Sequence, residues 1–264
     1  MAVNWGLDDK VALVTGAGSG IGKAAAILLA QNGVCVGAVA HKKEDAYKVA
    51  QEIEQTGGKV LPLTADISNP EEIEAAVEKL ASHWKRIDIL FANAGINGVW
   101  APLEKLAPED WDKTMNTNLK GTFLTVKYTV PHLKKQGGSI IVTSSVNGTR
   151  MFSNTGATAY ATSKAGQVAF TKMIALELAK HRVRANVICP GAIETSIHEN
   201  TEKRDLEKEE EPVEFPEGKI PLTDGKPGSP EQVARLVLFL ASDASDLITG
   251  TEIWIDGAES LLQG

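Results

Sequence analysis

Hydrophobic and polar positions follow two alternating patterns along the chain. Short runs rich in Val, Ile, Leu and Ala recur between longer segments whose apolar residues repeat at helical spacing. The short runs predict strands at 11–16, 34–40, 59–66, 87–95, 138–145, 184–191 and 252–256. The longer segments predict helices at 22–33, 44–57, 70–84, about 108–136, around Tyr160 and at 230–243. This alternation indicates parallel strands with helices on both faces of a sheet.

The order of these elements limits the fold. Right-handed crossovers leave few arrangements, and the doubly wound parallel sheet is the commonest of them. The sequence shows neither an internal repeat nor a linker, so we expect one domain over residues 1–264. The predicted fold class is therefore α/β, with a doubly wound parallel sheet of about seven strands between two layers of helices.

One segment, residues 196–219, interrupts this pattern. Its sequence, SIHENTEKRDLEKEEEPVEFPEGK, is highly charged and has few large apolar residues. A solvated surface excursion and a lid over a site would both have this composition. Because an insertion of this length in a compact domain is more often functional than idle, we expect a lid.

Composition and charge narrow the class of protein. Of 264 residues, 43% are hydrophobic and 23% are charged, which is ordinary for a globular domain. The net charge of −7 argues against nucleic acid or an anionic membrane as a partner. No run approaches the roughly 18 apolar residues that span a bilayer. The first ten residues contain no apolar signal core, so we expect a cytoplasmic protein.

Cysteine usage predicts neither a metal site nor a disulfide framework. Cys35 and Cys189 each lie inside an apolar run, where a small buried side chain is expected. The histidines show no partner at a useful spacing, so we expect no metal.

A glycine-rich turn, TGAGSGIG, follows the first predicted strand at residues 15–22. Gly16 permits a sharp turn from strand to helix, Gly20 lets the backbone approach a pyrophosphate, and Gly22 lets the helix pack closely on the strand. The helix that follows would present free N–H groups and the positive end of its dipole to an anion. In this position the turn predicts a dinucleotide site.

The end of the second predicted strand bears on which dinucleotide binds. A carboxylate there would accept hydrogen bonds from the adenosine ribose and repel a 2′-phosphate. The chain instead has Ala40 followed by His41, Lys42 and Lys43. These potential cations favour NADP(H) over NAD(H); a solvated basic turn with no role in cofactor binding is the alternative. Ser19 in the glycine turn is neutral, so the prediction depends on the basic residues.

The segment AYATSK places Tyr160 and Lys164 four positions apart on one face of a predicted helix. A packed tyrosine beside a solvated lysine would explain the pair. A general base would also explain it, because a nearby ammonium favours the tyrosinate. The neighbour would need to act strongly, since an unperturbed phenol has a pKa near 10.

Six motifs occur in an order that resembles the short-chain dehydrogenase/reductase family. They are TGAGSGIG, NAG at 93–95, NTNLKG at 116–121, SS at 144–145, YATSK at 160–164 and PGAIET at 190–195. The closing segment ITGTEIWIDG is similar to that family too, and the resemblance covers about residues 7–260. It implies a Rossmann-type fold and a hydride transfer between a nicotinamide and a carbonyl/alcohol pair.

The resemblance also implies a catalytic constellation. Tyr160 would donate or accept the proton, and Lys164, helped by the charge of an oxidised nicotinamide, would favour the tyrosinate and bind the nicotinamide ribose. Ser145 would hydrogen-bond the substrate oxygen, with Ser144 as the weaker candidate. The loop between Ser145 and Tyr160 is slightly longer than is usual for the family. Asn118 would kink a helix and hold a water in a proton relay to Lys164.

A wider set of residues is expected to contact the cofactor. By resemblance, Asp66 and Ile67 would contact the adenine and Asn93 and Ala94 its ribose, and the segment 190–195 would close over the nicotinamide. The expected cofactor contacts are Gly16, Ser19, Gly20, Ile21, Gly22, His41, Lys42, Asp66, Ile67, Asn93, Ala94, Gly95, Tyr160, Lys164, Pro190, Gly191, Ile193 and Thr195.

We therefore expect an NADP(H)-preferring oxidoreductase that interconverts a carbonyl and a secondary alcohol of a small molecule. An NAD(H)-dependent alcohol or sugar dehydrogenase of the same family is the alternative. A cofactor-sensing protein without activity is disfavoured because all four catalytic candidates are present. Within the family the chain resembles β-ketoacyl carrier-protein reductases and glucose-type dehydrogenases, and Lys134, Lys135 and Arg182 could contribute a docking surface for a carrier protein.

Two further expectations concern size and assembly. An epimerase or dehydratase would need a larger C-terminal substrate domain than the remaining residues after 191 allow. The long predicted helices at 108–136 and 160–180 are the surfaces that this family pairs, so we expect a homotetramer, with a dimer as the alternative. The segment FTKMIALELA fits either an interface or a core.

Overall fold

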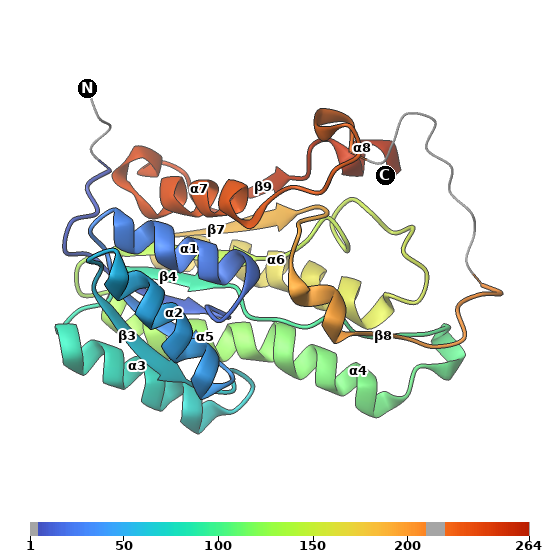
Figure 1. The fold of residues 1–264 in the computed structure, drawn as a ribbon, viewed down its shortest axis with the longest axis horizontal. Coiled ribbons are helices and arrows are strands. Elements are labelled where there is room, and N and C mark those ends of the chain that lie inside the picture. Colours follow the sequence, from blue (N-terminus) through green and yellow to red (C-terminus); the bar gives the residue numbers. More distant parts are fainter. Residues whose placement is uncertain (1–4, 210–219, 264) are drawn as a thin grey trace.

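The computed structural model describes residues 5–209 and 220–263. A seven-stranded parallel sheet forms its centre, in the order β3-β2-β1-β4-β6-β7-β9 (Figure 1). The strands are β1 Val11–Thr15, β2 Cys35–Ala40, β3 Val60–Thr64, β4 Ile89–Ala92, β6 Gly138–Thr143, β7 Val183–Pro190 and β9 Glu252–Ile255. Every pairing within this sheet is parallel. The predicted doubly wound sheet is therefore confirmed.

Helices cover both faces of the sheet, and successive strand residues point to opposite layers. On one face Val14 and Phe91 pack in the cluster that includes α1, α2 and α7. On the other face Leu13 and Leu90 pack in the cluster that includes α3, α5 and α6. The helices are α1 Gly20–Gln31, α2 Lys43–Gln55, α3 Pro70–Trp84, α4 Pro108–Met115, α5 Gly121–Leu133, α6 Thr158–Ala179, α7 Pro230–Ala241 and α8 Glu259–Gln263.

Helix α3 begins where its sequence predicts. The side chain of Asn69 accepts hydrogen bonds from the backbone N–H groups of Glu71 and Glu72, at 3.1 and 3.4 Å. Pro70 occupies the first helical position, where its missing N–H costs nothing. The two glutamates also lie at the positive end of the helix dipole.

The prediction of one continuous helix over 108–136 is wrong in its middle. A π-turn, Asn116–Lys120, joins α4 to α5. The hydrophobic repeat continues through this turn, so the sequence pattern does not reveal it. π-turns inside α-helices are frequent at functional sites, and this one contains the buried Asn118.

Two short strands lie outside the main sheet and were not predicted. Strand β5, Gly98–Trp100, pairs in parallel with β8, Thr201–Lys203. Three residues are too few for a recognisable alternation of apolar and polar positions. Strand β8 belongs to the segment 196–219 that was predicted as a lid. Residues 210–219 of that segment lie outside the described part of the chain.

The loops at the carboxyl ends of β1, β2, β4, β6 and β7 all lie along one edge of the sheet, as the parallel pairing requires. These loops, together with the first turns of the helices that follow them, carry most of the predicted site residues. Among the described residues, no helix is long and apolar enough to cross a membrane. Cys35 and Cys189 are both buried.

Candidate active site

The glycine turn between β1 and α1 leaves no room for side chains at two positions. Gly16 has a φ of 67°, a conformation that favours glycine. A Cβ at Gly16 would lie 2.9 Å from the Cα of Ala94, and one at Gly22 would lie 2.1 Å from the Gly16 carbonyl oxygen. Helix α1 begins at Gly20, and its N-cap Ser19 makes no side-chain capping bond. The helix N-terminus is therefore available to an anion, which fits the pyrophosphate of a dinucleotide.

The loop after β4 packs against this turn. The backbone N–H groups of Asn93 and Ala94 donate to the Thr15 hydroxyl, at 3.1 and 3.2 Å. The Thr143 hydroxyl, at the end of β6, donates to the Asn93 side chain at 3.1 Å. The structure thus brings the ends of β1, β4 and β6 together around the predicted ribose contacts. Gly95 continues this loop toward Asn118, whose side-chain oxygen would lie 3.0 Å from a Cβ at Gly95.

The predicted adenine contacts follow β3. Asp66 accepts hydrogen bonds from the backbone N–H and the hydroxyl of Ser68, both at 2.8 Å. Ile67 is buried and packs with Ile73 and Leu124. Asp66 is therefore held by its own loop, and Ile67 connects that loop to α3 and α5.

Tyr160 and Ser145 meet at the carboxyl end of β6. Tyr160 lies in the first turn of α6 and is 7% exposed. Burial raises the pKa of the Tyr160 phenol above its usual value, and a hydrogen bond with the Ser145 side chain opposes this effect. The Ser145 hydroxyl also accepts a bond from the backbone N–H of Asn147, at 3.1 Å. Ser144 points elsewhere, since its hydroxyl donates to the Lys164 carbonyl oxygen at 2.8 Å.

Lys164 is buried in the same cluster, with 3% of its surface exposed. Its ammonium lies 5.5 Å from the centroid of the Tyr160 ring and donates to the Thr143 carbonyl oxygen at 3.0 Å. Burial lowers the pKa of Lys164 to about 8. With the protein residues alone, burial dominates the pKa of Tyr160 and raises it, so the lowering expected from Lys164 is not seen.

Asn118 is completely buried in the π-turn and makes an unusual number of bonds. Its side chain accepts from the backbone N–H of Ile96 at 2.8 Å and donates to the Ile96 carbonyl oxygen at 2.9 Å. It also donates to the Ser163 hydroxyl, next to Lys164, at 3.0 Å. Asn118 thus connects the β4 loop to helix α6, which carries Tyr160 and Lys164. Asn116, by contrast, is exposed.

Gln167 is a residue of this site that the sequence patterns missed. It is 1% exposed, and its side-chain amide donates to the Asn118 carbonyl oxygen at 3.0 Å and to the Thr122 hydroxyl at 2.7 Å. The Thr122 hydroxyl donates to the same carbonyl at 2.7 Å. Because a carbonyl has two lone pairs, these bonds fill the Asn118 carbonyl. The relay water expected at Asn118 stays a prediction.

The segment after β7 is held by the end of the chain. The backbone N–H of Ala192 donates to the side chain of Glu259, in α8, at 2.8 Å. Ile193 is buried and bridges to Gly228, and a Cβ at Gly20 would lie 3.0 Å from Thr195. Of the predicted nicotinamide contacts Pro190, Gly191, Ile193 and Thr195, it is Thr195 that lies directly beside the glycine turn. Glu259 was not predicted, because its partner is far away in the sequence.

The end of β2 combines both signs of charge. His41 and Lys42 are exposed, as predicted for a surface that meets a phosphate. Lys43, however, lies over the Tyr47 ring, with its ammonium 5.6 Å from the ring centroid. An acid also reaches this point: a Cβ at Gly18 would lie 2.9 Å from the Cβ of Asp45. No acid follows Ala40 directly in the sequence, as expected. In the fold, however, Asp45 lies near the end of β2, so the expectation that no acid is present there is wrong.

The described part of the predicted lid, residues 196–209, packs over the edge that holds Tyr160. The Arg204 side chain donates to Asp110 in α4 at 2.8 Å, and its backbone N–H donates to the Trp100 carbonyl oxygen at 2.9 Å. Leu206 is buried, and Trp100 lies beside Tyr160 with ring centroids 6.5 Å apart. This segment therefore reaches the immediate surroundings of Tyr160 through β5.

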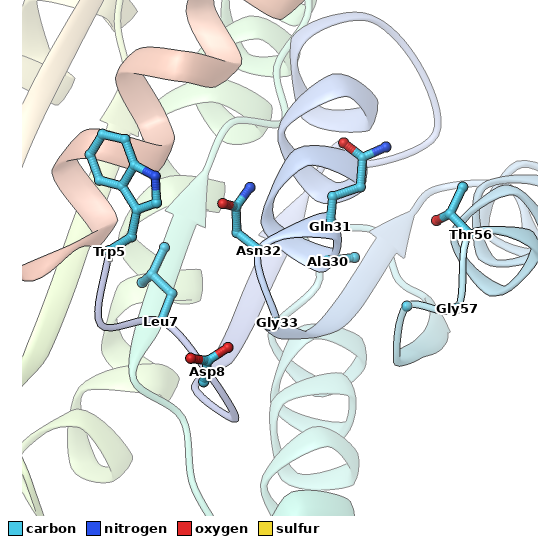
Figure 2. Close-up of a pocket in the computed structure, with 10 residues that line it drawn as sticks. Trp5, Leu7, Asp8, Ala30, Gln31, Asn32, Gly33, Thr56 and Gly57 are labelled. Atoms are coloured by element: carbon cyan, nitrogen blue, oxygen red, sulfur yellow. The ribbon is translucent and has the colours of Figure 1, made fainter. Parts of the chain in front are cut away.

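Two cavities lie outside the cluster around Tyr160. One, of about 430 Å³, is lined by residues that precede β1, β2 and β3, including Asp8, Asn32 and Thr56 (Figure 2). It therefore opens at the amino edge of the sheet, away from Tyr160. The other, of about 260 Å³, lies between α4, β5 and the lid segment and is lined by residues that include Asp110 and Glu202.

The possible docking residues for a carrier protein also lie at the amino edge. Lys134 and Lys135 precede β6, and Arg182 precedes β7. Within a single copy of the chain, these cations are at the opposite end of the strands from Tyr160. Among the described residues, no group of three or more His, Cys, Asp or Glu side chains could hold a metal ion.

Comparisons with known proteins agree with this geometry. A family model described as Enoyl-(Acyl carrier protein) reductase matches residues 16–258. The 3-oxoacyl-[acyl-carrier-protein] reductase FabG of Thermotoga maritima is 44% identical over 252 residues, which cover 95% of this chain and 98% of that protein. The cyclohexanol dehydrogenase of an Acinetobacter species is 38% identical over 252 residues and covers 95% of both chains.

Solved structures show the same relationship. A 3-ketoacyl-ACP reductase from Sinorhizobium meliloti has a TM-score of 0.92 and 50% identity, over 96% of this chain and 99% of that one. A 3-ketoacyl-(acyl-carrier-protein) reductase from Brucella melitensis, complexed with NADH, has a TM-score of 0.84 and 32% identity, over 96% and 99%. The chain belongs to the short-chain dehydrogenase/reductase family and is an NAD(P)-dependent oxidoreductase of CH–OH groups and their carbonyls.

Proposed function

We propose that the protein is an NADP(H)-preferring oxidoreductase that interconverts a carbonyl and a secondary alcohol, with Tyr160 as the general acid/base. One observation carries this proposal: Tyr160, Ser145 and Lys164 form one buried cluster at the sheet edge that also holds the glycine turn. When bound, the nicotinamide supplies the hydride. The residues of the chain supply the proton, the orientation of the substrate oxygen and the exclusion of water.

The acid–base chemistry follows from the burial of the cluster. Because the pKa of Tyr160 is raised, its phenol keeps its proton near neutral pH and can donate it to a substrate oxygen. Ser145 donates a second hydrogen bond to that oxygen and orients it toward Tyr160. In the reverse direction the phenolate is needed, and the charged form of Lys164 stabilises it. Since the pKa of Lys164 is about 8, that support weakens as the pH rises through this value.

Asn118 and Gln167 hold the cluster together in this proposal. Asn118 fixes the β4 loop to Ser163, so it positions the helix that carries Tyr160 and Lys164. Gln167 strengthens this connection from the next turn of α6. We assign both residues a positioning role, while Tyr160, Ser145 and Lys164 contact the substrate or the cofactor.

The preference for NADP(H) is supported by His41 and Lys42, which are exposed next to the end of β2. The pyrophosphate would lie at the N-terminus of α1, with Asp66, Ile67 and the 93–95 loop around the adenosine. The nicotinamide would lie between the 190–195 segment and Lys164. The lid segment at 196–209 would close over the substrate, because it is joined to β5 beside Tyr160.

The substrate class is narrowed by the relatives. A 3-ketoacyl thioester is the first candidate, because relatives named as 3-oxoacyl or 3-ketoacyl carrier-protein reductases share 44% and 50% identity with the chain. A cyclic alcohol or ketone is the second, because the cyclohexanol dehydrogenase shares 38%. Lys134 and Lys135, before β6, could serve a carrier protein only from a neighbouring copy in an assembly.

A homotetramer, or a dimer, remains part of the proposal. Helices α5 and α6 expose Phe123, Met173 and Leu176, and the rings of Phe123 and Phe170 make an edge contact across these two helices. Exposed apolar residues gathered on two neighbouring helices are typical of an interface. Analytical ultracentrifugation should give a mass of two or four chains; a mass of one chain would contradict the assembly.

The function is tested with Tyr160→Phe in a panel of carbonyl and alcohol substrates. The panel contains a 3-ketoacyl thioester, a cyclic ketone and an aldose, each with NADPH or NADH and the matching oxidised cofactors. We expect kcat to fall by about 10²–10⁴-fold while cofactor binding, followed by calorimetry, is unchanged. Tyr128→Phe, on α5, is the control. Activity that survives in Tyr160→Phe would remove Tyr160 from the mechanism, and a wild type that binds cofactor but converts nothing would favour a sensing protein.

A further inference from the structure

The ribose end of the predicted cofactor site contains a carboxylate that does not belong to β2. Gly18 lies in the glycine turn, and Ala40 is the last residue of β2. A Cβ at Gly18 would lie 3.3 Å from the Cβ of Ala40 and 2.9 Å from the Cβ of Asp45. These three residues are therefore mutual neighbours, at the place where an acid normally reads the adenosine ribose.

Asp45 reaches this place because of where α2 begins. The helix starts at Lys43, so Asp45 lies in its first turn, next to Ala46, which is buried against the sheet. The Asp45 side chain remains 42% exposed, and its partner Lys48 is 3.9 Å away with an exposed fraction of 73%. Such a surface pair is weak and screened, so the Asp45 carboxylate keeps most of its effect on a nearby anion.

The surrounding charges nearly cancel one another. His41 and Lys42 precede the helix and favour a phosphate, while Glu44 and Asp45 follow in the first turn. Lys43 is directed toward the Tyr47 ring. A 2′-phosphate at this point would therefore meet both attraction and repulsion, and the carboxylate nearest to the glycine turn is that of Asp45.

From this juxtaposition of Gly18, Ala40 and Asp45 we infer that Asp45 is a specificity-determining residue for the cofactor. Its carboxylate accepts a hydrogen bond from a ribose 2′-hydroxyl and repels a 2′-phosphate, so it limits the preference for NADP(H) that His41 and Lys42 favour. The inference rests on the proposed function, since it concerns the same cofactor site. It predicts that the enzyme uses both cofactors and that removing this carboxylate moves the balance further toward NADP(H).

The chain offers a matched control in Glu44. It is next to Asp45, has the same charge and lies in the same helical turn, but it is exposed and absent from the neighbours of Gly18. If Asp45 acted only through the helix dipole or the net charge, Glu44→Gln would have the same effect as Asp45→Asn. If Asp45 acts by contact with the ribose, only Asp45→Asn will change the selectivity.

The test measures binding without turnover. Calorimetric titrations of the full chain with adenosine 2′,5′-bisphosphate and with AMP give the ratio of the two dissociation constants. We expect Asp45→Asn to shift this ratio toward the bisphosphate by about tenfold, the order of one close like-charge interaction, and Glu44→Gln to shift it by about twofold or less. Asp45→Ser serves as a second variant, and thermal melting verifies that each protein is folded.

Two outcomes separate this inference from the proposed function. An unchanged ratio in both Asp45 variants, or an equal change in Glu44→Gln, would overturn the role of Asp45. A wild type that prefers AMP over the bisphosphate would instead contradict the proposed preference for NADP(H), and a shift in Asp45→Asn would still support Asp45. Steady-state ratios of kcat/KM for NADPH and NADH should move in the same direction as the binding ratio.

Discussion

Helix α6, which carries Tyr160 and Lys164, and the first turn of α2 flank the same edge of the sheet, yet they hold their charges differently. In α6, Lys164 is buried and bonded to the Thr143 carbonyl oxygen, and Gln167 is bonded to the Asn118 carbonyl oxygen. At the start of α2, residues 41–44 are exposed and Asp45 is partly covered. The Lys164 and Gln167 donors in the first region have fixed partners, whereas the charges in the second region act together and are weakened by solvent and salt.

This difference sets the size of the effects that substitutions should have. A buried polar atom that loses its partner keeps its full desolvation penalty. A charge on an exposed turn changes an equilibrium by a small factor and can be offset by its neighbours. Single substitutions in the buried cluster around Tyr160 should therefore have large effects. Substitutions in the turn at residues 41–45 should have small effects on the choice of cofactor.

The largest effect is expected for Lys164→Met. Catalysis should fall by about 10²-fold or more, because the variant would lose the proposed support for the tyrosinate and the proposed contact with the ribose. The unfolding free energy of the wild type should also depend on pH, and it should rise as the pH rises. Lys164 has a folded pKa of about 8, below its value of about 10.4 in an unfolded chain. The unfolded state therefore binds more protons in that window, and wild-type stability rises with pH there.

The measurement is guanidinium unfolding between about pH 8 and about pH 10, below the raised pKa of Tyr160. The wild type should gain about 2–3 kcal/mol of unfolding free energy relative to Lys164→Met over this range. Lys180→Met, at the exposed end of α6, should behave as the wild type does. Parallel pH profiles for the wild type and Lys164→Met would show that burial does not lower the pKa of Lys164.

An intermediate effect is expected for Gln167→Leu. The variant removes one of the two donors to the Asn118 carbonyl oxygen, so the unfolding free energy should fall by about 1–3 kcal/mol. A shift of the π-turn against α6 should lower kcat by about 10- to 100-fold with little change in KM. Steady-state kinetics and the pH dependence of kcat are the readouts, with Gln51→Leu on the surface of α2 as the control. A loss of stability with an unchanged kcat would assign Gln167 a purely structural role.

The smallest effect is expected for Ala40→Asp, at the buried end of β2 next to the exposed turn. The new carboxylate would lie beside Asp45 and Gly18, so the ratio of kcat/KM for NADPH to that for NADH should fall by about tenfold. Because two like charges would then be close together, thermal melting should show a modest loss of stability. An unchanged cofactor ratio would mean that the turn after β2 does not read the 2′-phosphate.

The regular elements of the fold could be predicted from the sequence, because the repeat of apolar residues along a segment shows which of its faces is buried. The seven strands and α3 follow from runs such as VALVT and from the SNPEE start signal. The π-turn was missed because the apolar repeat continues through it, and β5 and β8 were missed because each has only three residues. Their pairing depends on contacts between distant parts of the chain.

The same reason separates the predicted site residues from those that were missed. Tyr160, Lys164 and Ser145 belong to local motifs, and the structure brings them together. Gln167 bonds to a residue 49 positions away, and Glu259 to one 67 positions away. Asp45 is only five residues beyond Ala40, but its position depends on how the first turn of α2 lies on the glycine turn. A pattern along one strand could not reveal any of these contacts.

The bond between Glu259 and the Ala192 backbone N–H has a practical consequence for work with this protein. The final helix, α8, is joined to the segment that follows β7, so its end is a poor place for an affinity tag or a fluorescent fusion. Trimming the sequence before Glu259 for crystallisation would also release that segment. An expression vector with its tag at the amino terminus leaves this connection intact.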